Sequence, residues 1–197
     1  MRLLYSIILF LSLCLAEAQS FKAVIQKGHG EAVKSAEVTP DGKYLITASR
    51  DKTVKIWDAI SGKEIRSLVG HDHTVNGFSL NGTTLATSSA DGTVGVWNIE
   101  TGEMVWQSEK FREYVTSVEY SPNGQLLAVG SYADSISIIK TSDFSLLKKI
   151  KANSDRGVGY GVSVNFSNDG TYLIVGEDNR AAKVYATSDW KLKYDFK

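Results

Sequence analysis

Residues 28–58 decide the fold of this chain, and they read GHGEAVKSAEVTPDGKYLITASRDKTVKIWD. Short runs of alternating polar and apolar residues lie on both sides of Thr39-Pro40-Asp41-Gly42, a stretch with the chemistry of a tight turn. Alternation with a period of two is typical of β-strands that bury one face. A closely similar stretch at residues 70–98 reads GHDHTVNGFSLNGTTLATSSADGTVGVWN. We therefore expect the chain to be built from copies of one strand-rich unit.

Two weaker copies follow, and corresponding large residues recur at a period of roughly 40 residues, at Trp57, Trp97, Ile139 and Tyr185. Each copy contains four strand-like runs. In the first copy these runs are residues 33–38, 44–48, 54–57 and 64–68. We predict that the four copies span residues 27–69, 70–109, 110–151 and 152–197.

The N-terminus has the pattern of an export signal. Arg2 precedes an apolar run from Leu3 to Leu15, and Ala16-Glu17-Ala18 follows it as a small-residue cleavage site. The apolar run is too short for a membrane span, which needs about 20 residues. Cys14 resembles a lipidation site, but the bulky Leu13 before it argues against that alternative. We predict a secretory signal peptide at residues 1–18, a mature domain at 19–197, and a secreted, periplasmic or extracellular location.

Composition limits the kinds of partner. Lysine plus arginine and aspartate plus glutamate balance at 22 each. Because a neutral chain is not attracted to nucleic acid or to an acidic membrane surface, we expect neither as a partner after signal cleavage. Cys14 is the only cysteine and lies in the predicted signal, so the mature chain has no disulfides to support it.

The Gly-His opening, the Trp-Asp ending, the period and the turns together resemble the WD-repeat β-propeller family. The resemblance covers residues 21–197 and is closest in the first two copies. It implies an all-β fold, a β-propeller of four-stranded antiparallel blades with four WD-type repeats, as a partial ring or half of a larger propeller. The signal-like N-terminus makes the chain similar to exported, bacterial-type WD-repeat domains.

The first two copies contain Ser, His and Asp, which suggests a hydrolase triad. The resemblance implies a structural role instead, in which Asp orients His, His meets the Ser hydroxyl, and the hydroxyl meets the Trp N–H. The residues of this predicted hydrogen-bond chain are His29, Ser49, Asp51 and Trp57, and then His71, Ser89, Asp91 and Trp97. No nucleophile-elbow motif is present. Copies three and four lack the His, and we expect them to be held by apolar packing alone.

We expect no catalytic residues, no metal and no cofactor. His71-Asp72-His73 lacks a third metal ligand in view. The resemblance places partner binding at one rim, on the loops before the first strand and between the second and third strands of each copy. The candidate rim residues are Lys34, Arg50, His73, Asn76, Arg112, Tyr114, Tyr132 and Tyr160.

The function predicted on this basis is a non-catalytic, exported scaffold that binds a protein or peptide on its rim. One alternative is an accessory or sensor segment of a larger exported enzyme, such as a peptidase. A third is a propeller enzyme that acts on small molecules in a central channel.

Closure of the ring is left open by the strand count. Residues 21–26 have the pattern of an outer strand of a preceding blade, while the last copy has its own outer strand at residues 191–196. Three explanations remain: the chain is a fragment of a longer protein, two chains form an eight-bladed homodimeric ring, or four blades form an incomplete curved stack.

Overall fold

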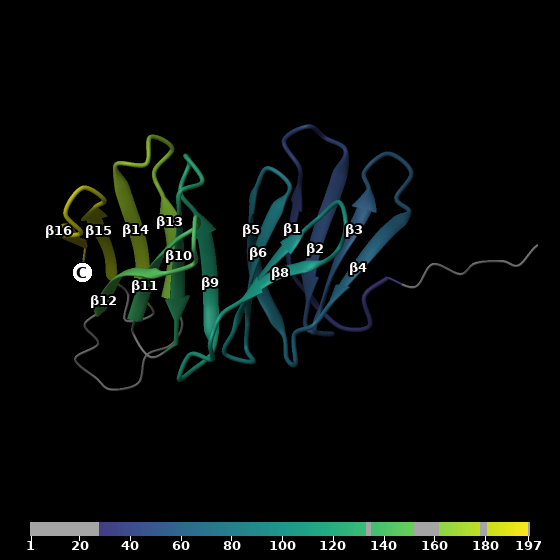
Figure 1. The fold of residues 1–197 in the computed structure, drawn as a ribbon, viewed down its shortest axis with the longest axis horizontal. Coiled ribbons are helices and arrows are strands. Elements are labelled where there is room, and N and C mark those ends of the chain that lie inside the picture. The colour runs from purple at the N-terminus through teal and green to yellow at the C-terminus, as the bar shows by residue number, and fades with distance from the viewer. Residues whose placement is uncertain (1–27, 133–134, 152–161, 178–180, 197) are drawn as a thin grey trace, which may run out of the picture.

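A computed structural model describes residues 28–132, 135–151, 162–177 and 181–196. This part of the chain contains sixteen strands in four four-stranded sheets and no helix (Figure 1). The predicted all-β fold of four-stranded antiparallel sheets is therefore confirmed. The predicted signal peptide at residues 1–18 and the predicted strand at residues 21–26 lie outside the described residues.

Each sheet is formed by four consecutive strands, and each strand pairs antiparallel with its neighbours in chain order. The first sheet contains β1 (Val33–Val38), β2 (Tyr44–Ser49), β3 (Thr53–Asp58) and β4 (Glu64–Val69). The second contains β5 (Val75–Asn81), β6 (Thr84–Ser89), β7 (Val94–Asn98) and β8 (Met104–Gln107). The third contains β9 (Val115–Tyr120), β10 (Leu126–Ser131), β11 (Ser135–Lys140) and β12 (Leu146–Lys151). The fourth contains β13 (Val162–Phe166), β14 (Tyr172–Glu177), β15 (Ala181–Ala186) and β16 (Leu192–Phe196).

Tight turns connect the strands as their chemistry predicts. Gly42 closes the turn between β1 and β2 with a φ of 70°, and its N–H donates to the Thr39 carbonyl at 2.8 Å. Gly82, in the two-residue connection between β5 and β6, has a φ of 59°. A side chain at either position would meet the steric penalty of the left-handed region, which glycine avoids.

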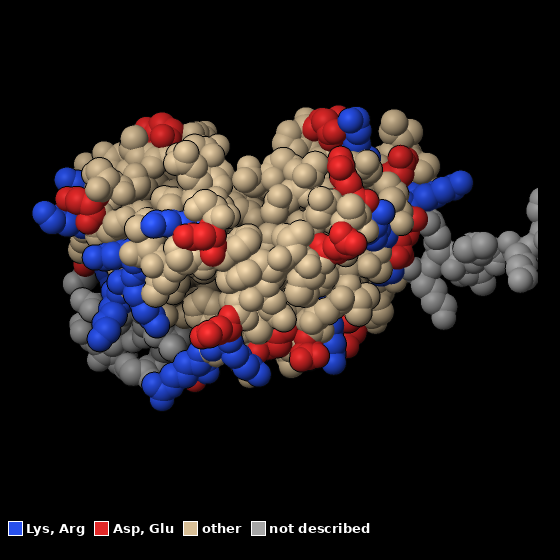
Figure 2. Space-filling model, in the orientation of Figure 1, with Lys and Arg blue, Asp and Glu red and all other residues tan. Residues whose placement is uncertain are grey.

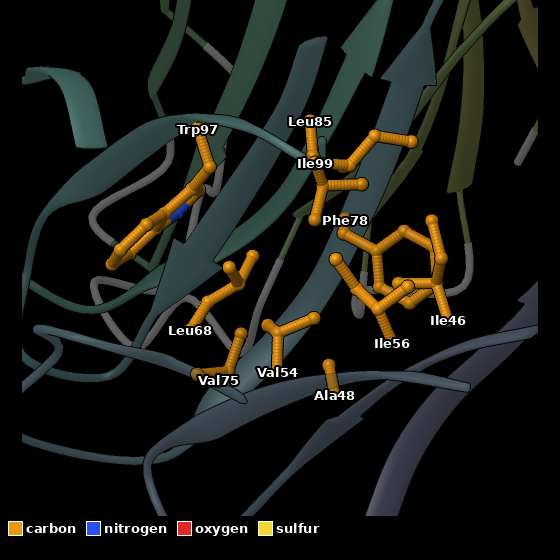
Figure 3. Packing of buried hydrophobic residues seen from close by; sticks show 10 residues of the cluster. All are labelled: Ile46, Ala48, Val54, Ile56, Leu68, Val75, Phe78, Leu85, Trp97 and Ile99. Carbon is orange, nitrogen blue, oxygen red and sulfur yellow. The ribbon is translucent and has the colours of Figure 1, made fainter. Parts of the chain in front are cut away.

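The sheets stack face to face in chain order (Figure 1). Apolar side chains fill the space between them. Between the first and second sheets, Ile46 and Ile56 lie beside Phe78, and the Trp97 indole lies across the same layer (Figure 3). Ile46 and Ile56 are each 1 % exposed. Burial of a side chain of this size stabilises the fold by roughly 1.5–3 kcal/mol.

Hydrogen bonds also join the first strands of neighbouring sheets. The Tyr120 N–H of β9 donates to the Ser79 hydroxyl of β5 at 3.0 Å. The Ser117 hydroxyl of β9 donates to the Val162 carbonyl of β13 at 2.7 Å and accepts from the Val164 N–H at 3.1 Å. Apolar packing therefore joins all three pairs of neighbouring sheets, and different hydrogen bonds add to it between the second and third sheets and between the third and fourth.

The expectation that the third and fourth copies rest on apolar packing alone is wrong. In the fourth sheet the Lys183 ammonium lies 2.7 Å from the Glu177 carboxylate, and the two side chains are only 6 % and 5 % exposed. In the third sheet the hydroxyls of Ser131 and Ser135 lie 2.8 Å apart in the interior. Each sheet thus contains buried polar groups that satisfy one another.

The described residues include no helix that is long and apolar enough to cross a membrane.

Candidate functional site

The predicted hydrogen-bond chain of the first sheet is built around Asp51, in the turn between β2 and β3. Its carboxylate lies 2.9 Å from His29 Nδ1 and accepts from the Gly30 N–H at 2.8 Å and the Thr53 hydroxyl at 2.7 Å. His29 Nε2 lies 2.7 Å from the hydroxyl of Thr47, which accepts the Trp57 indole N–H at 2.8 Å. The chain links the loop before β1, the strand β2, the turn and the strand β3.

The second sheet repeats this geometry. His71 Nδ1 lies 2.9 Å from the Asp91 carboxylate, and His71 Nε2 lies 2.7 Å from the Thr87 hydroxyl. The Trp97 indole N–H donates to the same hydroxyl at 2.9 Å. Because an ionised carboxylate only accepts, we infer that Nδ1 carries the proton and that Nε2 accepts from the threonine.

The hydroxyl in both chains belongs to threonine, so the assignment of Ser49 and Ser89 to this position is wrong. Ser49 Oγ donates to the Glu31 carbonyl at 3.3 Å and accepts from the Asp51 N–H at 3.1 Å. Ser89 makes the corresponding bonds to the His73 carbonyl and the Asp91 N–H. Both serines therefore hold the turn, and neither hydroxyl contacts a histidine ring.

Strand geometry explains the threonine. In the register of β2 and β3, Leu45 lies opposite Trp57 and Thr47 lies opposite Lys55. A side chain diagonal to Trp57, two residues along the same face, is within reach of a long aromatic side chain. Thr47 has this diagonal position, whereas Ser49 lies two residues farther along, at the end of the strand.

The aspartates are held ionised. Burial alone would raise the pKa of Asp91, but hydrogen bonds from Thr93, from the Asp72 N–H and from His71 outweigh it and lower the pKa to about 2. The pKa of Asp51 is also lowered, because hydrogen bonds from Thr53, Gly30 and His29 outweigh the effect of burial. An ionised aspartate anchored by several donors is suited to fixing the orientation of a histidine.

Three of the candidate rim residues form a continuous aromatic row: His73, Tyr114 and Tyr132. The His73 and Tyr114 rings are stacked, with centroids 6.4 Å apart and planes at 18°. The Tyr114 and Tyr132 rings lie 6.1 Å apart at 60°. A backbone bond of 2.8 Å from the Tyr132 N–H to the Tyr114 carbonyl fixes the spacing of the two tyrosines.

The aromatic row lies on one rim of the stack. Since strands alternate in direction within each sheet, the loops before the first strand and after the second strand lie at the same rim. His73 precedes β5, Tyr114 precedes β9 and Tyr132 follows β10. Tyr114 is 52 % exposed.

The other rim candidates are distributed differently. Arg50 forms a surface ion pair with Glu31, with 3.3 Å between Nε and Oε2. Lys34, on β1, and Arg112, before β9, are exposed. Asn76 is half-buried, and its amide donates to the Val115 carbonyl at 2.8 Å, which joins the second sheet to the third. Tyr160 lies outside the described residues.

Four stacked, four-stranded antiparallel sheets, two of them with an Asp–His–Thr–Trp chain, define a protein of tandem propeller blades. Comparison with known families gives the same answer. The WD domain, G-beta repeat family matches residues 20–58 and 62–98, and the anaphase-promoting complex subunit 4 WD40 domain matches residues 103–164. The chain belongs to the WD-repeat family.

The chain is similar to several known proteins, and it spans less than a third of the length of each of them. "Pre-mRNA-processing factor 19 homolog 2" of Arabidopsis thaliana is 30 % identical over 164 residues, which is 77 % of this chain and 29 % of the relative. "Nuclear distribution protein PAC1" of Mycosarcoma maydis is 48 % identical over 56 residues, 27 % of this chain and 12 % of the relative. A "Ribosome biogenesis protein BOP1 homolog" of Drosophila mojavensis is 41 % identical over 51 residues, 26 % of this chain and 6 % of the relative.

These relatives contradict the predicted location. Their names refer to pre-mRNA processing and ribosome biogenesis, which are processes of the cell interior. The prediction of a secreted or periplasmic protein is therefore wrong. That prediction depends on the apolar run at the N-terminus, which is recognised by its composition alone. A match over 164 residues of the repeats carries more information about the protein than such a run does.

Proposed function

We propose that the chain is a non-catalytic scaffold that binds a protein or peptide through the aromatic row on its rim. The observation that carries this proposal is the row of ring contacts from His73 through Tyr114 to Tyr132 across two neighbouring sheets. Exposed aromatic side chains, tyrosine above all, are residues that commonly dominate the energetics of protein interfaces. A backbone bond fixes the spacing of the two tyrosines, so they need little ordering when a partner binds.

Two further observations support a binding role. The histidines of the Asp–His–Thr–Trp chains are occupied on both ring nitrogens by neighbours within 2.9 Å. A histidine engaged in this way holds strands together. In addition, the relatives' names describe a processing factor, a distribution protein and a biogenesis protein, and none of these names states a reaction.

A quantitative enrichment experiment tests the proposal. The tagged chain and its Tyr114→Ala variant are used to capture proteins from an extract of the source cells, and captured proteins are compared by mass spectrometry. We expect partners of the wild-type chain to be depleted at least roughly 5-fold by the variant, since loss of an interface hot spot costs more than 1 kcal/mol.

Ile60→Ala provides the matched control. Ile60 is 95 % exposed in the connection between β3 and β4, which lies at the opposite rim. Its replacement should leave the captured proteins unchanged. Equal capture by wild type and Tyr114→Ala would refute binding through the aromatic row.

We further propose that a second copy of the chain completes the ring of sheets. The support for this is that both ends of the stack expose large apolar side chains, among them Val38 at 51 % and Phe196 at 59 %. Isolated sheet faces of this kind are usually covered in a propeller by a neighbouring blade.

A further inference from the structure

Every contact between sheets in this molecule joins two different kinds of face. The forward face of a sheet is the one turned toward the next sheet, such as Ile46 and Ile56 of the first sheet. The rear face is turned toward the preceding sheet, such as Leu85 and Trp97 of the second. Within the described residues, no sheet therefore covers the rear face of the first sheet or the forward face of the fourth.

The forward face of the fourth sheet has the composition of a covered face. Ile174 of β14 lies opposite Val184 of β15, as Ile46 of β2 lies opposite Ile56 of β3. Ile174 and Val184 are therefore equivalent to Ile46 and Ile56. Ile46 and Ile56 are buried at 1 % exposure, whereas Ile174 and Val184 are only half-buried. Val184 lies opposite Tyr194 of β16, which is 56 % exposed.

The outer part of this face is aromatic. Phe196 lies opposite Ala182 on the same face, and its ring stacks on that of Tyr194 with 6.1 Å between centroids. Phe196 is 59 % exposed, and Tyr172 of β14 is 38 % exposed. A contiguous exposed apolar patch of this kind marks an interaction surface.

The rear face of the first sheet is of the kind that binds a forward face inside the stack. Trp57 is half-buried, whereas the equivalent Trp97 is 2 % exposed because the first sheet covers it. Val38 is 51 % exposed, whereas the equivalent Tyr120 is 6 % exposed under the second sheet. The side chains that a preceding sheet would cover are present, and nothing in the described chain covers them.

One polar contact inside the stack, between the second and third sheets, has its equivalent positions at the two ends. Inside the stack, the Tyr120 N–H donates to the Ser79 hydroxyl. Val38 is the last residue of β1, as Tyr120 is of β9. Asn165 lies opposite Ile174 of the second strand of its sheet, as Ser79 lies opposite Ala86, so Asn165 has the position of Ser79. Asn165 is exposed. Its side-chain oxygen is suited to accept from the Val38 N–H of another copy.

We propose that the forward face of the fourth sheet binds the rear face of the first sheet of a second copy, and that the reverse contact closes a ring of eight sheets. This inference rests on the proposed completion of the ring by two copies and adds which surfaces meet. Head-to-tail contacts form a ring if the rotation closes and an open filament if it does not. Eight blades lie within the range of known propellers.

Pairing through the outer strand β12 is disfavoured by charge. Lys148, Lys149 and Lys151 are exposed on β12, and Figure 2 shows basic side chains gathered around this strand. Lysines along an edge strand oppose the addition of another strand. Charge on β12 therefore favours a face-to-face contact over pairing along this edge.

Disulfide trapping tests the arrangement. In a Cys14→Ser background, the substitutions Val38→Cys and Asn165→Cys place one thiol on each end face, at positions whose internal counterparts are hydrogen-bonded neighbours. A backbone N–H that bonds to the other residue's side chain at 3.0 Å places the two residues as near neighbours, which a disulfide requires. On oxidation we expect a single covalent dimer on a non-reducing gel, while each single-cysteine variant stays monomeric on the gel.

A second variant pair checks the apolar part of the contact. Phe196→Asp should raise the dimer dissociation constant by roughly 30-fold or more, the loss expected for an aromatic interface anchor. Leu146→Asp is the matched control, because Leu146 has the same 59 % exposure but lies on β12, away from both end faces. It should leave dimerisation unchanged, and circular dichroism should show both variants folded.

Other outcomes would show which part of the proposal fails: the closed ring, the head-to-tail contact or the dimer itself. A ladder of covalent oligomers would overturn the closed ring. A dimer in solution that does not cross-link through these positions would overturn the head-to-tail contact while keeping the proposed dimer. A folded monomer that captures its partners normally would overturn the dimer and leave the rim scaffold standing.

Discussion

The hydrogen-bond chain of the second sheet depends on the hydroxyl group of Thr87. It lies 2.7 Å from His71 Nε2 and accepts the Trp97 indole N–H at 2.9 Å. Thr87→Val keeps the shape but leaves both neighbours without their partner, so the free energy of unfolding should fall by about 1–3 kcal/mol. Urea denaturation measures this change.

A double-mutant cycle distinguishes Thr87 from Ser89. Thr87→Val and Trp97→Phe should be non-additive by about 0.5–3 kcal/mol, because the two residues share a hydrogen bond. The Ser89 hydroxyl bonds to the His73 carbonyl and the Asp91 N–H rather than to the Trp97 indole, so Ser89→Ala and Trp97→Phe should be additive. The opposite pattern would return the serine to the position that the sequence suggested.

Acid should weaken the same chain of residues. The pKa of Asp91 is lowered from its ordinary value of 3.8 to about 2, so the folded state binds its proton less readily than the unfolded state. The resulting stability is complete above the ordinary pKa and is lost as pH falls toward the lowered one. We expect thermal melts to show a decline between pH 4 and pH 2 that is smaller in Asp91→Asn, and an equal decline in that variant would contradict the assignment.

The sequence contains a pattern that points to the threonine but is easily missed. Thr47 and Thr87 each stand four residues before the turn aspartate, in the two copies that also have His and Trp. Val129 and Val175 replace them in the two copies without the His. His, Asp and Trp were identified because their chemistry is distinctive, whereas a threonine in a strand is also explained by β-propensity alone.

At the scale of strands, the buried pair Lys183–Glu177 makes the fourth sheet sensitive to single charge changes. Lys183→Met removes the ammonium from a carboxylate that is 5 % exposed, so the loss of stability should be about 3–5 kcal/mol. Urea denaturation is the measurement. The double variant Lys183→Met with Glu177→Gln should recover part of the loss, because no buried charge remains without its counter-ion.

The exposed pair Lys191–Asp189 is the control for this prediction. Lys191 Nζ lies 3.6 Å from Asp189 Oδ2, and the two side chains are 79 % and 41 % exposed, respectively. Lys191→Met should therefore change stability by no more than about 1 kcal/mol. A similar loss in both variants would show that the burial of Lys183 has no energetic effect.

Strand positions were predictable because local chemistry sets them. The runs at residues 33–38 and 64–68 correspond to β1 and to nearly all of β4, since alternation and turn residues act within a few positions. The Lys183–Glu177 pair was not predictable in this way. It depends on how β14 and β15 are registered and on what covers their shared face, which are properties of the assembled sheet.

At the scale of the whole molecule, the repeat makes the ends of the stack different from its interior. Leu85, Leu127 and Leu173 are 0 % exposed under a preceding sheet, while the equivalent Leu45 of the first sheet is half-buried. The sequence predicted the repeating unit and also the problem of closure. It did not identify the surfaces that remain open, because exposure depends on which neighbours each sheet has.

Sedimentation equilibrium of the full chain determines whether the face-to-face contact between sheets continues between two copies. The chain has a mass of 21.6 kDa. We expect a single species of twice that mass at micromolar concentration, reduced to the mass of one chain by Phe196→Asp and unchanged by Leu146→Asp. A folded wild-type species that stays at the mass of one chain would contradict this expectation.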